Sequence, residues 1–164
     1  MEQVLIGKIL KPKGLDGTLK VTNFSLGELA NNIKCVFACD KYYNVLRVYT
    51  AKEFVYFKVD GINSIEDAEK FRGKQLYADR SELGLNNNQY IATDFLNMEV
   101  YTENEKLGKV PDVETHANRD ILLIKTRRGE FLVPFADGLV ESVDLGAKRL
   151  YINEKTYNEV KCEN

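Results

Sequence analysis

The sequence has few of the residues that usually mark a catalytic or metal centre. It contains a single histidine, His116, and no tryptophan. A histidine-based triad would need Thr115, Asn118 or Asp120 from the same loop, and there is neither a Gly-x-Ser-x-Gly elbow nor a phosphate loop that ends in Gly-Lys-Ser/Thr. One histidine and scattered carboxylates give no zinc or two-metal spacing. We therefore predict a protein that is not an enzyme and that needs no cofactor or metal.

Cysteines and long apolar runs are also scarce. The three cysteines, Cys35, Cys39 and Cys162, lack the two-residue gap and the second ligand pair of a zinc knuckle, so we expect reduced thiols. No apolar run approaches the roughly 20 residues that cross a bilayer, and the first seven residues do not resemble a secretory signal. We expect a cytoplasmic location and no membrane partner.

The composition that remains is that of a folded protein with an uneven charge distribution. The chain is 44% hydrophobic and 29% charged, with a formal net charge of -2. Residues 1–85 hold 13 Lys/Arg and 11 Asp/Glu, a net charge of +2, whereas residues 86–164 hold 10 and 14, a net charge of -4. The two halves are therefore suited to different partners, although neither is as basic as a dedicated nucleic-acid module.

Short runs rich in Val, Ile, Tyr and Phe recur along the chain, separated by turn residues, which is typical of small β-barrels. A polar, Asn-rich stretch divides them into a domain at 1–84, a linker at 85–89 and a domain at 90–164. The predicted strands of the first domain are 3–10, 18–23, 35–39, 43–49, 54–59 and 75–78. Those of the second are 99–102, 109–114, 121–125, 131–134 and 149–152, with hairpin turns at 104–105, 127–130 and 144–147.

One short helix is predicted at 64–73. Ser64 can cap its start, Asp67 can return the bond, and Gly73 can end it in the left-handed conformation. Three apolar residues share one face and should plug an open side or end of the first barrel: Ile65, Ala68 and Phe71. In the second domain the alternating residues Phe131, Val133 and Phe135 are expected to face the core, with Pro134 at the strand's end.

The segment from Gly7 to Val21 is the most informative stretch. Two predicted strands flank a loop whose backbone is fixed by Pro12, Gly14 and Gly17. Lysines concentrate positive charge on or near this loop: Lys8, Lys11, Lys13 and Lys20. A rigid basic loop can hold RNA phosphates without reading bases, although a solvated hairpin would have the same composition.

This segment, read as Gly-Lys-Ile-x-Lys-Pro-x-Gly-Leu-x-Gly-x-Leu-Lys-Val, resembles the N-terminal signature of the RimM family of bacterial ribosome maturation factors. Residues 61–73 resemble the family's helix and its entry. The second half resembles a PRC barrel in ordered motifs: Gln89-Tyr90-Ile91 before Asp94-Phe95-Leu96, Met98 to Tyr101, Leu107 to Val110, Ala117-Asn118 before Asp120-Ile121-Leu122, and Phe131 to Phe135 running into Val143-Asp144-Leu145. The resemblance covers nearly the whole chain.

The resemblance implies an all-β protein of two small barrels, an N-terminal split barrel with one short helix and a C-terminal PRC barrel. It also implies a non-enzymatic assembly factor for the small ribosomal subunit that assists processing of ribosomal RNA. The expected partners are the small subunit, its head-region protein number nineteen and adjacent ribosomal RNA. The PRC barrel of this chain is expected to bind the protein, and the basic loop is expected to bind the RNA. We expect a monomer.

The protein-binding residues that we predict lie around two loops of the second half. They are Tyr90, Ile91, Asp94, Phe95, Asn118, Arg119 and Asp120. Aromatic residues can anchor a partner, but Tyr90 and Phe95 can equally belong to the barrel core. Asp94 can pair with a basic partner or cap its own turn.

The sequence departs from the family pattern at several of these positions. Lys13 stands where the family usually has histidine, Ile91 where it has a second tyrosine, and Asn97 where it favours glycine. The loop at 116–120 carries one extra residue. The substitution at Lys13 removes the imidazole from the basic loop. The departures at Ile91 and in the loop at 116–120 alter part of the expected protein contact.

Two other functions fit the same composition. A split barrel can hold flavin, which would make the protein an oxidoreductase with a visible absorbance spectrum. A PRC-type adaptor could serve a partner outside the ribosome, although the match from Gly7 to Val21 disfavours that interpretation.

Overall fold

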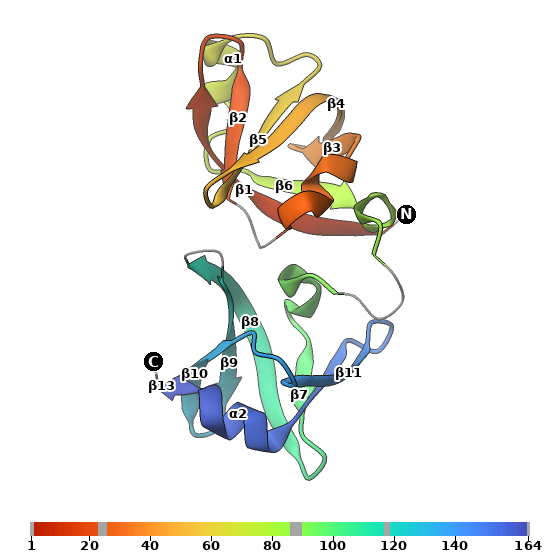
Figure 1. Ribbon diagram of the computed structural model, residues 1–164, viewed down its shortest axis with the longest axis vertical. Helices are drawn as coiled ribbons and strands as arrows, with labels where there is room; N and C mark the ends of the chain where they lie inside the picture. Colours follow the sequence, from red (N-terminus) through yellow and green to blue (C-terminus); the bar gives the residue numbers. More distant parts are fainter. Residues whose placement is uncertain (1, 23–25, 86–89, 117–118, 164) are drawn as a thin grey trace. The chain divides into compact units, whose positions relative to one another are not determined.

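The chain folds into two compact domains. The computed structural model describes residues 2–22, 26–85, 90–116 and 119–163 (Figure 1). The first domain comprises Met1–Tyr90 and the second Ile91–Asn164. This division falls next to the predicted linker at 85–89, of which only Leu85 is described.

The first domain is a closed antiparallel barrel with the strand order β1-β2-β5-β4-β3-β6. Closure pairs β1 with both β2 and β6, so every strand has two neighbours. All six strands were predicted, several with shorter limits. Their bounds are β1 Gln3–Lys13, β2 Thr18–Thr22, β3 Cys35–Ala38, β4 Lys41–Ala51, β5 Phe54–Val59 and β6 Gln75–Asp79.

The alternation of side chains sets which face of each strand enters the barrel. In β5, Val55, Phe57 and Val59 are completely buried and face the core. The residues between them lie on the outer face, where Tyr56 is covered by neighbouring side chains. The barrel therefore has an apolar interior and an outer surface on which polar and aromatic residues meet across strands.

The predicted helix forms as α1 (Ile65–Glu69), with Ser64 Oγ accepting a hydrogen bond from Asp67 N at 3.1 Å. Gly73 follows with φ +81°. Ala68 is fully buried, as predicted, but Ile65 is 40% exposed, so its assignment to the buried face was wrong. The helix has fewer than two turns, and therefore cannot bury a full stripe. Two short 3-10 helices, η1 (Gly27–Asn32) and η2 (Arg80–Leu83), complete the domain.

The second domain is built on a seven-stranded sheet with the order β11-β12-β7-β8-β9-β10-β13. The pairs are antiparallel except β12 with β7, which is parallel. The three predicted turns join β7 to β8, β9 to β10 and β11 to β12. The strands are β7 Glu99–Tyr101, β8 Lys106–His116, β9 Arg119–Thr126, β10 Gly129–Pro134, β11 Val140–Asp144, β12 Arg149–Ile152 and β13 Cys162–Glu163.

Four elements of this domain were not predicted. They are β11, β13, the 3-10 helix η3 (Ala92–Phe95) and the helix α2 (Glu154–Val160). Asn153 caps α2 by accepting a hydrogen bond from Thr156 N at 3.0 Å, and Tyr157 packs inward with 3% exposure. The fold class, two β domains, is confirmed.

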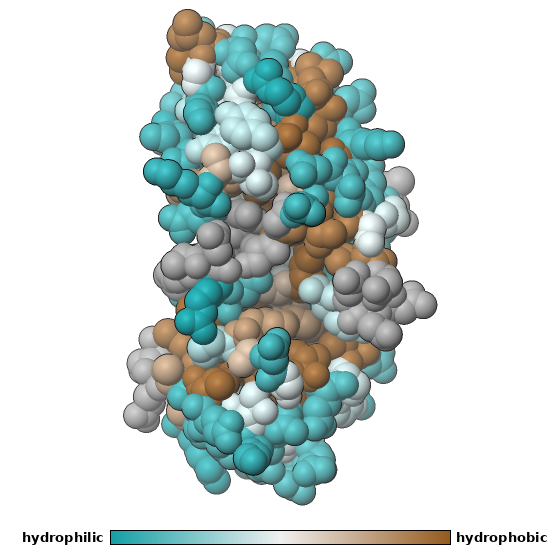
Figure 2. All heavy atoms as spheres, in the orientation of Figure 1, coloured by the Kyte–Doolittle hydropathy of each residue, from teal (hydrophilic) through white to brown (hydrophobic). Residues whose placement is uncertain are grey.

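The surface of both domains is mainly hydrophilic on the face drawn in Figure 2, with hydrophobic side chains in limited patches. Among the large hydrophobic side chains of the described residues, that of Leu15 is the most exposed, at 84%, in the turn between β1 and β2. Of the helices that the structure describes, none has the length and apolar character needed to cross a membrane.

Candidate nucleic-acid and protein interfaces

The turn between β1 and β2 is held rigidly. Gly14 and Gly17 have φ values of +79° and +84°, which favour glycine. A Cβ atom on Gly17 would lie 2.7 Å from the carbonyl oxygen of Ile62, so the backbones touch there. Asp16 Oδ1 accepts hydrogen bonds from Thr18 N at 3.1 Å and from Thr18 Oγ1 at 2.7 Å. Just before the turn, Pro12 pairs with Leu19 across the strands.

Two cations near this turn have structural partners. Arg47 pairs with Asp16 at 3.2 Å, and Lys58 Nζ donates to the carbonyl oxygen of Asp16 at 2.7 Å and to Asn63 Oδ1 at 3.0 Å. The hydrogen bonds from Thr18, together with the charges of Lys58 and Arg47, hold the pKa of Asp16 below its usual value. These two cations therefore brace the turn.

The predicted lysines occupy a different position, on the outer face of the barrel. The register of the strands places Lys11 opposite Lys20, Lys20 opposite Tyr56, and Tyr56 opposite Tyr49. These four residues form one row across β1, β2, β5 and β4. Like charges directly opposite each other on an antiparallel pair are unfavourable.

Aromatic rings lie beneath the ammonium groups of this face. Lys20 Nζ is 4.0 Å from the ring centroid of Phe54, and Lys13 Nζ is 4.2 Å from that of Tyr56. The rings of Tyr49 and Tyr56 stack with centroids 4.9 Å apart and an interplanar angle of 17°. We call the set Lys11, Lys13, Lys20, Tyr49, Phe54 and Tyr56 the lysine–tyrosine face.

None of the four predicted lysines has a carboxylate partner within the described residues. Three of them belong to the lysine–tyrosine face, whereas Lys8 pairs with Gln75 of β6 on the other side of β1. The unpaired ammonium groups can hold phosphates, and the half-buried rings of Tyr49 and Phe54 offer surfaces for bases. Tyr49 and Tyr56 were missed from the sequence, because only the register of four strands brings them to the lysines.

In the second domain, two of the predicted protein-binding residues belong to the core. Phe95 is 0% exposed and Ile91 is 5% exposed, so neither offers a contact surface in this structure. Both flank or end η3, which packs on β8 and β9. Asp94 Oδ2 accepts a hydrogen bond from Ile91 N at 3.1 Å, which stabilises this short helix. Burial of this apolar turn thus places Phe95 in the core, one of the two positions expected for it, and corrects the surface position expected for Ile91.

Phe135 presents an exposed aromatic ring next to Phe95. Its ring stacks on that of Phe95 with centroids 5.3 Å apart, and it is 39% exposed. The prediction that Phe135 lies in the core was wrong, because β10 ends at Pro134 and the chain turns away after it. Phe135 N donates to the carbonyl oxygen of Asp120 at 3.0 Å, which ties this residue to β9.

The remaining predicted residues are divided between the domains. Tyr90 belongs to the first domain, where the guanidinium of Arg80 lies 5.8 Å from its ring. Arg119 and Asp120 begin β9 and pair with His116 and Thr115 of β8. Arg119 is exposed and Asp120 is half-buried. Asn118 lies outside the described residues. Arg119 and Asp120 therefore lie at one end of the β8–β9 hairpin. The backbone hydrogen bond between Phe135 and Asp120 holds Phe135 at the same end.

The described residues contain no group of three or more His, Cys, Asp or Glu side chains arranged to hold a metal ion. The cysteines in these ranges are all free thiols. The arrangements that the structure does present are a cationic aromatic face in the first domain and an acidic end with an exposed aromatic ring in the second.

Comparison with known proteins identifies both domains. The family model of the RimM N-terminal domain matches residues 4–83, and that of the RimM PRC barrel domain matches residues 92–155. The ribosome maturation factor RimM of Lactobacillus gasseri is 37% identical over 157 residues, covering 90% of this chain and 91% of its own length. That of Aquifex aeolicus is 33% identical, covering 94% and 96%.

Among solved structures, a 16S ribosomal RNA processing protein RimM from Pseudomonas aeruginosa is similar with a TM-score of 0.45. Its sequence identity is 23%, and the alignment covers 93% of this chain and 97% of that one.

Proposed function

The chain belongs to the RimM family of ribosome maturation factors, and from that premise we propose that it assists assembly of the small ribosomal subunit by binding two components of it. The first domain binds ribosomal RNA through the lysine–tyrosine face. The second domain binds the head-region protein number nineteen through the end of the β8–β9 hairpin next to η3. The proposed action is to hold these components together and involves no bond-breaking step.

The observation that supports RNA binding most strongly is the row Lys11, Lys20, Tyr56 and Tyr49. Two opposed lysines without a carboxylate partner in the described ranges raise the electrostatic energy of the free protein. Phosphates relieve that repulsion and release their condensed counterions on binding. The half-buried ring of Tyr49, which stacks on the buried Tyr56 beside the lysines, suits a strand with unstacked bases, because base–aromatic stacking tolerates any sequence.

The second domain supports a basic protein partner at its η3 end. The carboxylates of Asp94 and Asp120 lie in segments that pack on this end of the sheet, and Phe135 exposes an aromatic ring there. An aromatic anchor with carboxylates around it is suited to a cationic protein surface. Two linked domains that bind neighbouring components gain affinity, because the second contact becomes intramolecular.

Co-sedimentation of the full chain with free small ribosomal subunits tests the proposal, with intact ribosomes for comparison. We expect selective binding to free subunits. The triple variant Lys11→Gln, Lys13→Gln, Lys20→Gln should bind at least tenfold more weakly in low salt, because it removes three phosphate contacts but keeps the aliphatic stems. A second variant, Asp94→Asn with Asp120→Asn, should weaken binding to purified protein number nineteen. Asparagine keeps an acceptor oxygen, so that η3 stays capped.

The matched control is Lys34→Gln, Lys41→Gln, Lys70→Gln, which removes three exposed lysines from other parts of the first domain. It should keep wild-type affinity. If both lysine variants lost the same affinity for the subunit, the effect would depend on net charge alone. That result would contradict binding through the lysine–tyrosine face. Binding to intact ribosomes as strong as to free subunits would contradict the role in assembly.

A further inference from the structure

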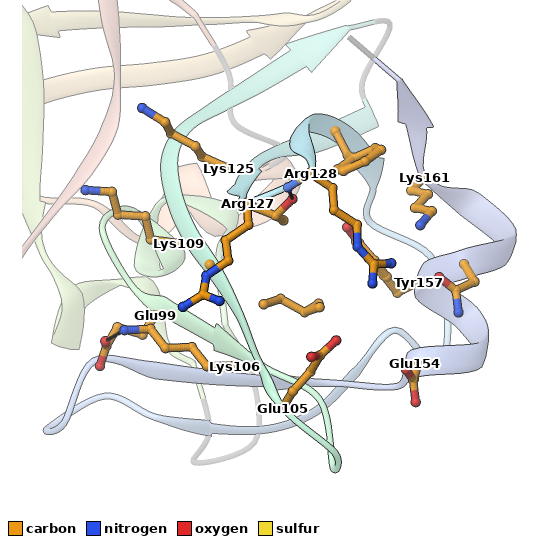
Figure 3. A pocket seen from close by; sticks show the side chains of 15 residues that line it. Glu99, Glu105, Lys106, Lys109, Lys125, Arg127, Arg128, Glu154, Tyr157 and Lys161 are labelled. Carbon is orange, nitrogen blue, oxygen red and sulfur yellow. Dashed lines mark hydrogen bonds and ion pairs between the residues drawn. The ribbon is translucent and has the colours of Figure 1, made fainter.

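The second domain is acidic overall, but most of its cationic side chains gather around one cavity. Residues 91–164 carry a net charge of -4, yet a cavity of about 830 Å³ is lined by six cationic side chains and three carboxylates, a net charge of +3. The cavity lies between the turn regions of β8, β9 and β10 on one side and α2 on the other (Figure 3). Six of the ten Lys and Arg residues of this domain therefore gather here: Lys106, Lys109, Lys125, Arg127, Arg128 and Lys161.

Two of these lysines face each other across the sheet. Lys109 of β8 is directly opposite Lys125 of β9, and both are exposed. Gly108 allows the two strands to approach closely here, since a Cβ atom on it would lie 1.9 Å from the Lys125 carbonyl oxygen. The register fixes two like charges side by side, which is unfavourable, and it also places Glu99 opposite Lys109 and Glu130 opposite Lys125 on the flanking strands.

The nearby carboxylates compensate this charge only in part. Glu105 also lines the cavity, and Glu130 lies opposite Lys125 on β10 without forming an ion pair with it. Glu99 forms an ion pair with Lys106 and lies 3.9 Å from Arg149 Nε, and Glu154 accepts a hydrogen bond from Asn104 at 2.7 Å. Within the described ranges, no carboxylate lies within ion-pair distance of four cations of the lining. These are Lys109, Lys125, Arg127 and Arg128.

The two arginines are displayed on a fixed turn. The backbone nitrogen of Arg128 donates to Thr126 Oγ1 at 3.1 Å, and this hydroxyl donates to the carbonyl oxygen of Gly129 at 3.0 Å. Figure 3 shows both arginine side chains projecting from this turn, with Arg128 toward α2. A fixed turn lowers the entropy lost when a guanidinium binds an anion.

The opposite wall combines an aromatic surface with a cation. The rings of Phe131 and Tyr157 meet edge to face with centroids 6.4 Å apart, and Lys161 Nζ lies 5.0 Å from each. Phe131 is half-buried and presents part of its ring to the cavity. Tyr157 is only 3% exposed, so the available ring surface is that of Phe131. A ring bordered by cations suits a nucleic-acid strand better than a free anion, which uses no apolar surface.

We propose that this cavity is a second RNA-binding site, which holds consecutive phosphates of a single strand along Lys109, Lys125, Arg127 and Arg128. The cations are spread over two strands, a turn and the residue that follows α2, and do not converge on one point. The cavity is also much larger than one phosphate. The cavity opens at the Lys106 end of β8, whereas the proposed protein contact uses the His116 end of this 11-residue strand. Lys109, the proposed RNA-binding residue on β8, is seven residues from His116, or about 23 Å at about 3.3 Å per residue, so one domain can bind RNA and protein together.

Fluorescence anisotropy of the full chain with a labelled 12-nucleotide oligouridine tests this site. The starting protein is the triple variant Lys11→Gln, Lys13→Gln, Lys20→Gln, so that the remaining RNA binding comes from elsewhere. Adding Arg127→Gln and Arg128→Gln should weaken this remaining binding about tenfold at 50 mM salt. The slope of log affinity against log salt should become less negative by about 1.4, since each single-strand phosphate contact contributes about 0.7.

The matched control adds Lys148→Gln and Lys155→Gln to the same triple variant, which removes two exposed lysines outside the cavity. It should leave affinity and slope unchanged. The proposal is wrong if the control loses as much as the arginine variant, or if the triple variant has no remaining binding at 50 mM salt. Comparing the triple variant with the wild-type chain tests the first domain separately, so failure of either site can be told from failure of the other.

Amide NMR shifts on the full wild-type chain give a second measurement. On adding the oligouridine, we expect shifts in the β9–β10 turn and in α2. Shifts confined to the first domain would contradict the proposal even if the arginine variant binds weakly.

Discussion

The two domains carry the same pair of opposed lysines in different surroundings. Lys11 and Lys20 meet across β1 and β2 of a domain with net positive charge, and Lys109 and Lys125 meet across β8 and β9 of a domain with net negative charge. The first pair lies on an open sheet face beside aromatic rings. The second lies at the edge of a cavity. The net charge of a domain is therefore a poor guide to the partners of its individual surfaces.

The surroundings determine how each pair is tolerated in the free protein. In the first domain a ring lies close to the ammonium group of Lys20, and a cation near a ring face is stabilised by roughly 0.5–1 kcal/mol at an exposed site. In the second domain the neighbouring carboxylate Glu99 is already engaged by Lys106. We expect the first surface to depend on rings as well as charge, and the second mainly on charge.

The largest effect on the stability of each domain should come from substituting the glycine at which two backbone segments approach most closely. Gly17→Ala places a Cβ atom 2.7 Å from a carbonyl oxygen at a positive φ, and Gly108→Ala places one 1.9 Å from another. Each should lower the free energy of unfolding of its own domain by about 3 kcal/mol, since overpacking costs about 1–3 kcal/mol and backbone strain adds to it. Amide hydrogen exchange, followed separately for peptides of each domain, measures the loss.

Gly146→Ala is the control for this pair, because its nearest neighbour would be Asp144 Oδ1 at 3.6 Å, an ordinary contact. Its effect should stay within about 0.5 kcal/mol. If Gly108→Ala destabilised both domains equally, they would unfold as one unit and the comparison between them would fail.

A smaller effect should separate rings from charges on the lysine–tyrosine face. Tyr49→Leu should reduce affinity for single-stranded RNA roughly tenfold with no change in salt dependence, because base stacking contributes about 1–3 kcal/mol per base. Lys11→Gln with Lys20→Gln should instead make the salt slope less negative by about 1.4. Anisotropy titrations at several salt concentrations measure both. Tyr49→Phe, which keeps the ring, should bind like the wild type, and a loss equal to that of the leucine variant would argue against stacking.

The smallest effect concerns pH. Hydrogen bonds from Thr18 lower the pKa of Asp16, so the folded first domain gains stability from ionised Asp16 above about pH 4, and loses it as pH falls through the lowered value. Burial raises the pKa of Tyr157, so the second domain gains stability from the neutral phenol below about pH 10, and loses it as pH rises through the raised value.

Asp16→Asn should therefore reduce the loss of unfolding free energy that the first domain shows as the pH falls, which we call its acid limb. Tyr157→Phe should reduce the loss that the second domain shows as the pH rises, its alkaline limb. Hydrogen exchange and urea unfolding between pH 3 and pH 11 measure these limbs. An unchanged acid limb in Asp16→Asn, or an unchanged alkaline limb in Tyr157→Phe, would assign the pH dependence to other groups.

Much of the fold could be predicted, because strands with alternating apolar residues and turns rich in glycine are local signals. The cap of α1 at Ser64 was predicted for the same reason. The helix α2 was missed because it has only seven residues and its buried face rests on Tyr157. Phe135 was misassigned because strand alternation was extended past Pro134, where β10 ends.

The sites were less predictable than the fold, since they depend on contacts between distant strands. The lysines at the β1–β2 turn stand out in the sequence, but Tyr49 joins them only through the register of β4 and β5. The cavity of the second domain combines side chains from several strands and α2, and its cations are diluted among fourteen acidic residues in the sequence. No local pattern reveals such a site.

The two sheets also differ in what they leave open. The first barrel is closed, whereas the second sheet ends at β11 and β13, whose outer backbone groups have no strand beside them among the described residues. Such edges invite pairing between molecules and aggregation. β13 has only two residues, and β11 carries Glu141 and Asp144, whose negative charges would meet their own copies in an edge-to-edge pair. The negative charges of Glu141 and Asp144 thus disfavour pairing of this edge with the same edge of a second copy.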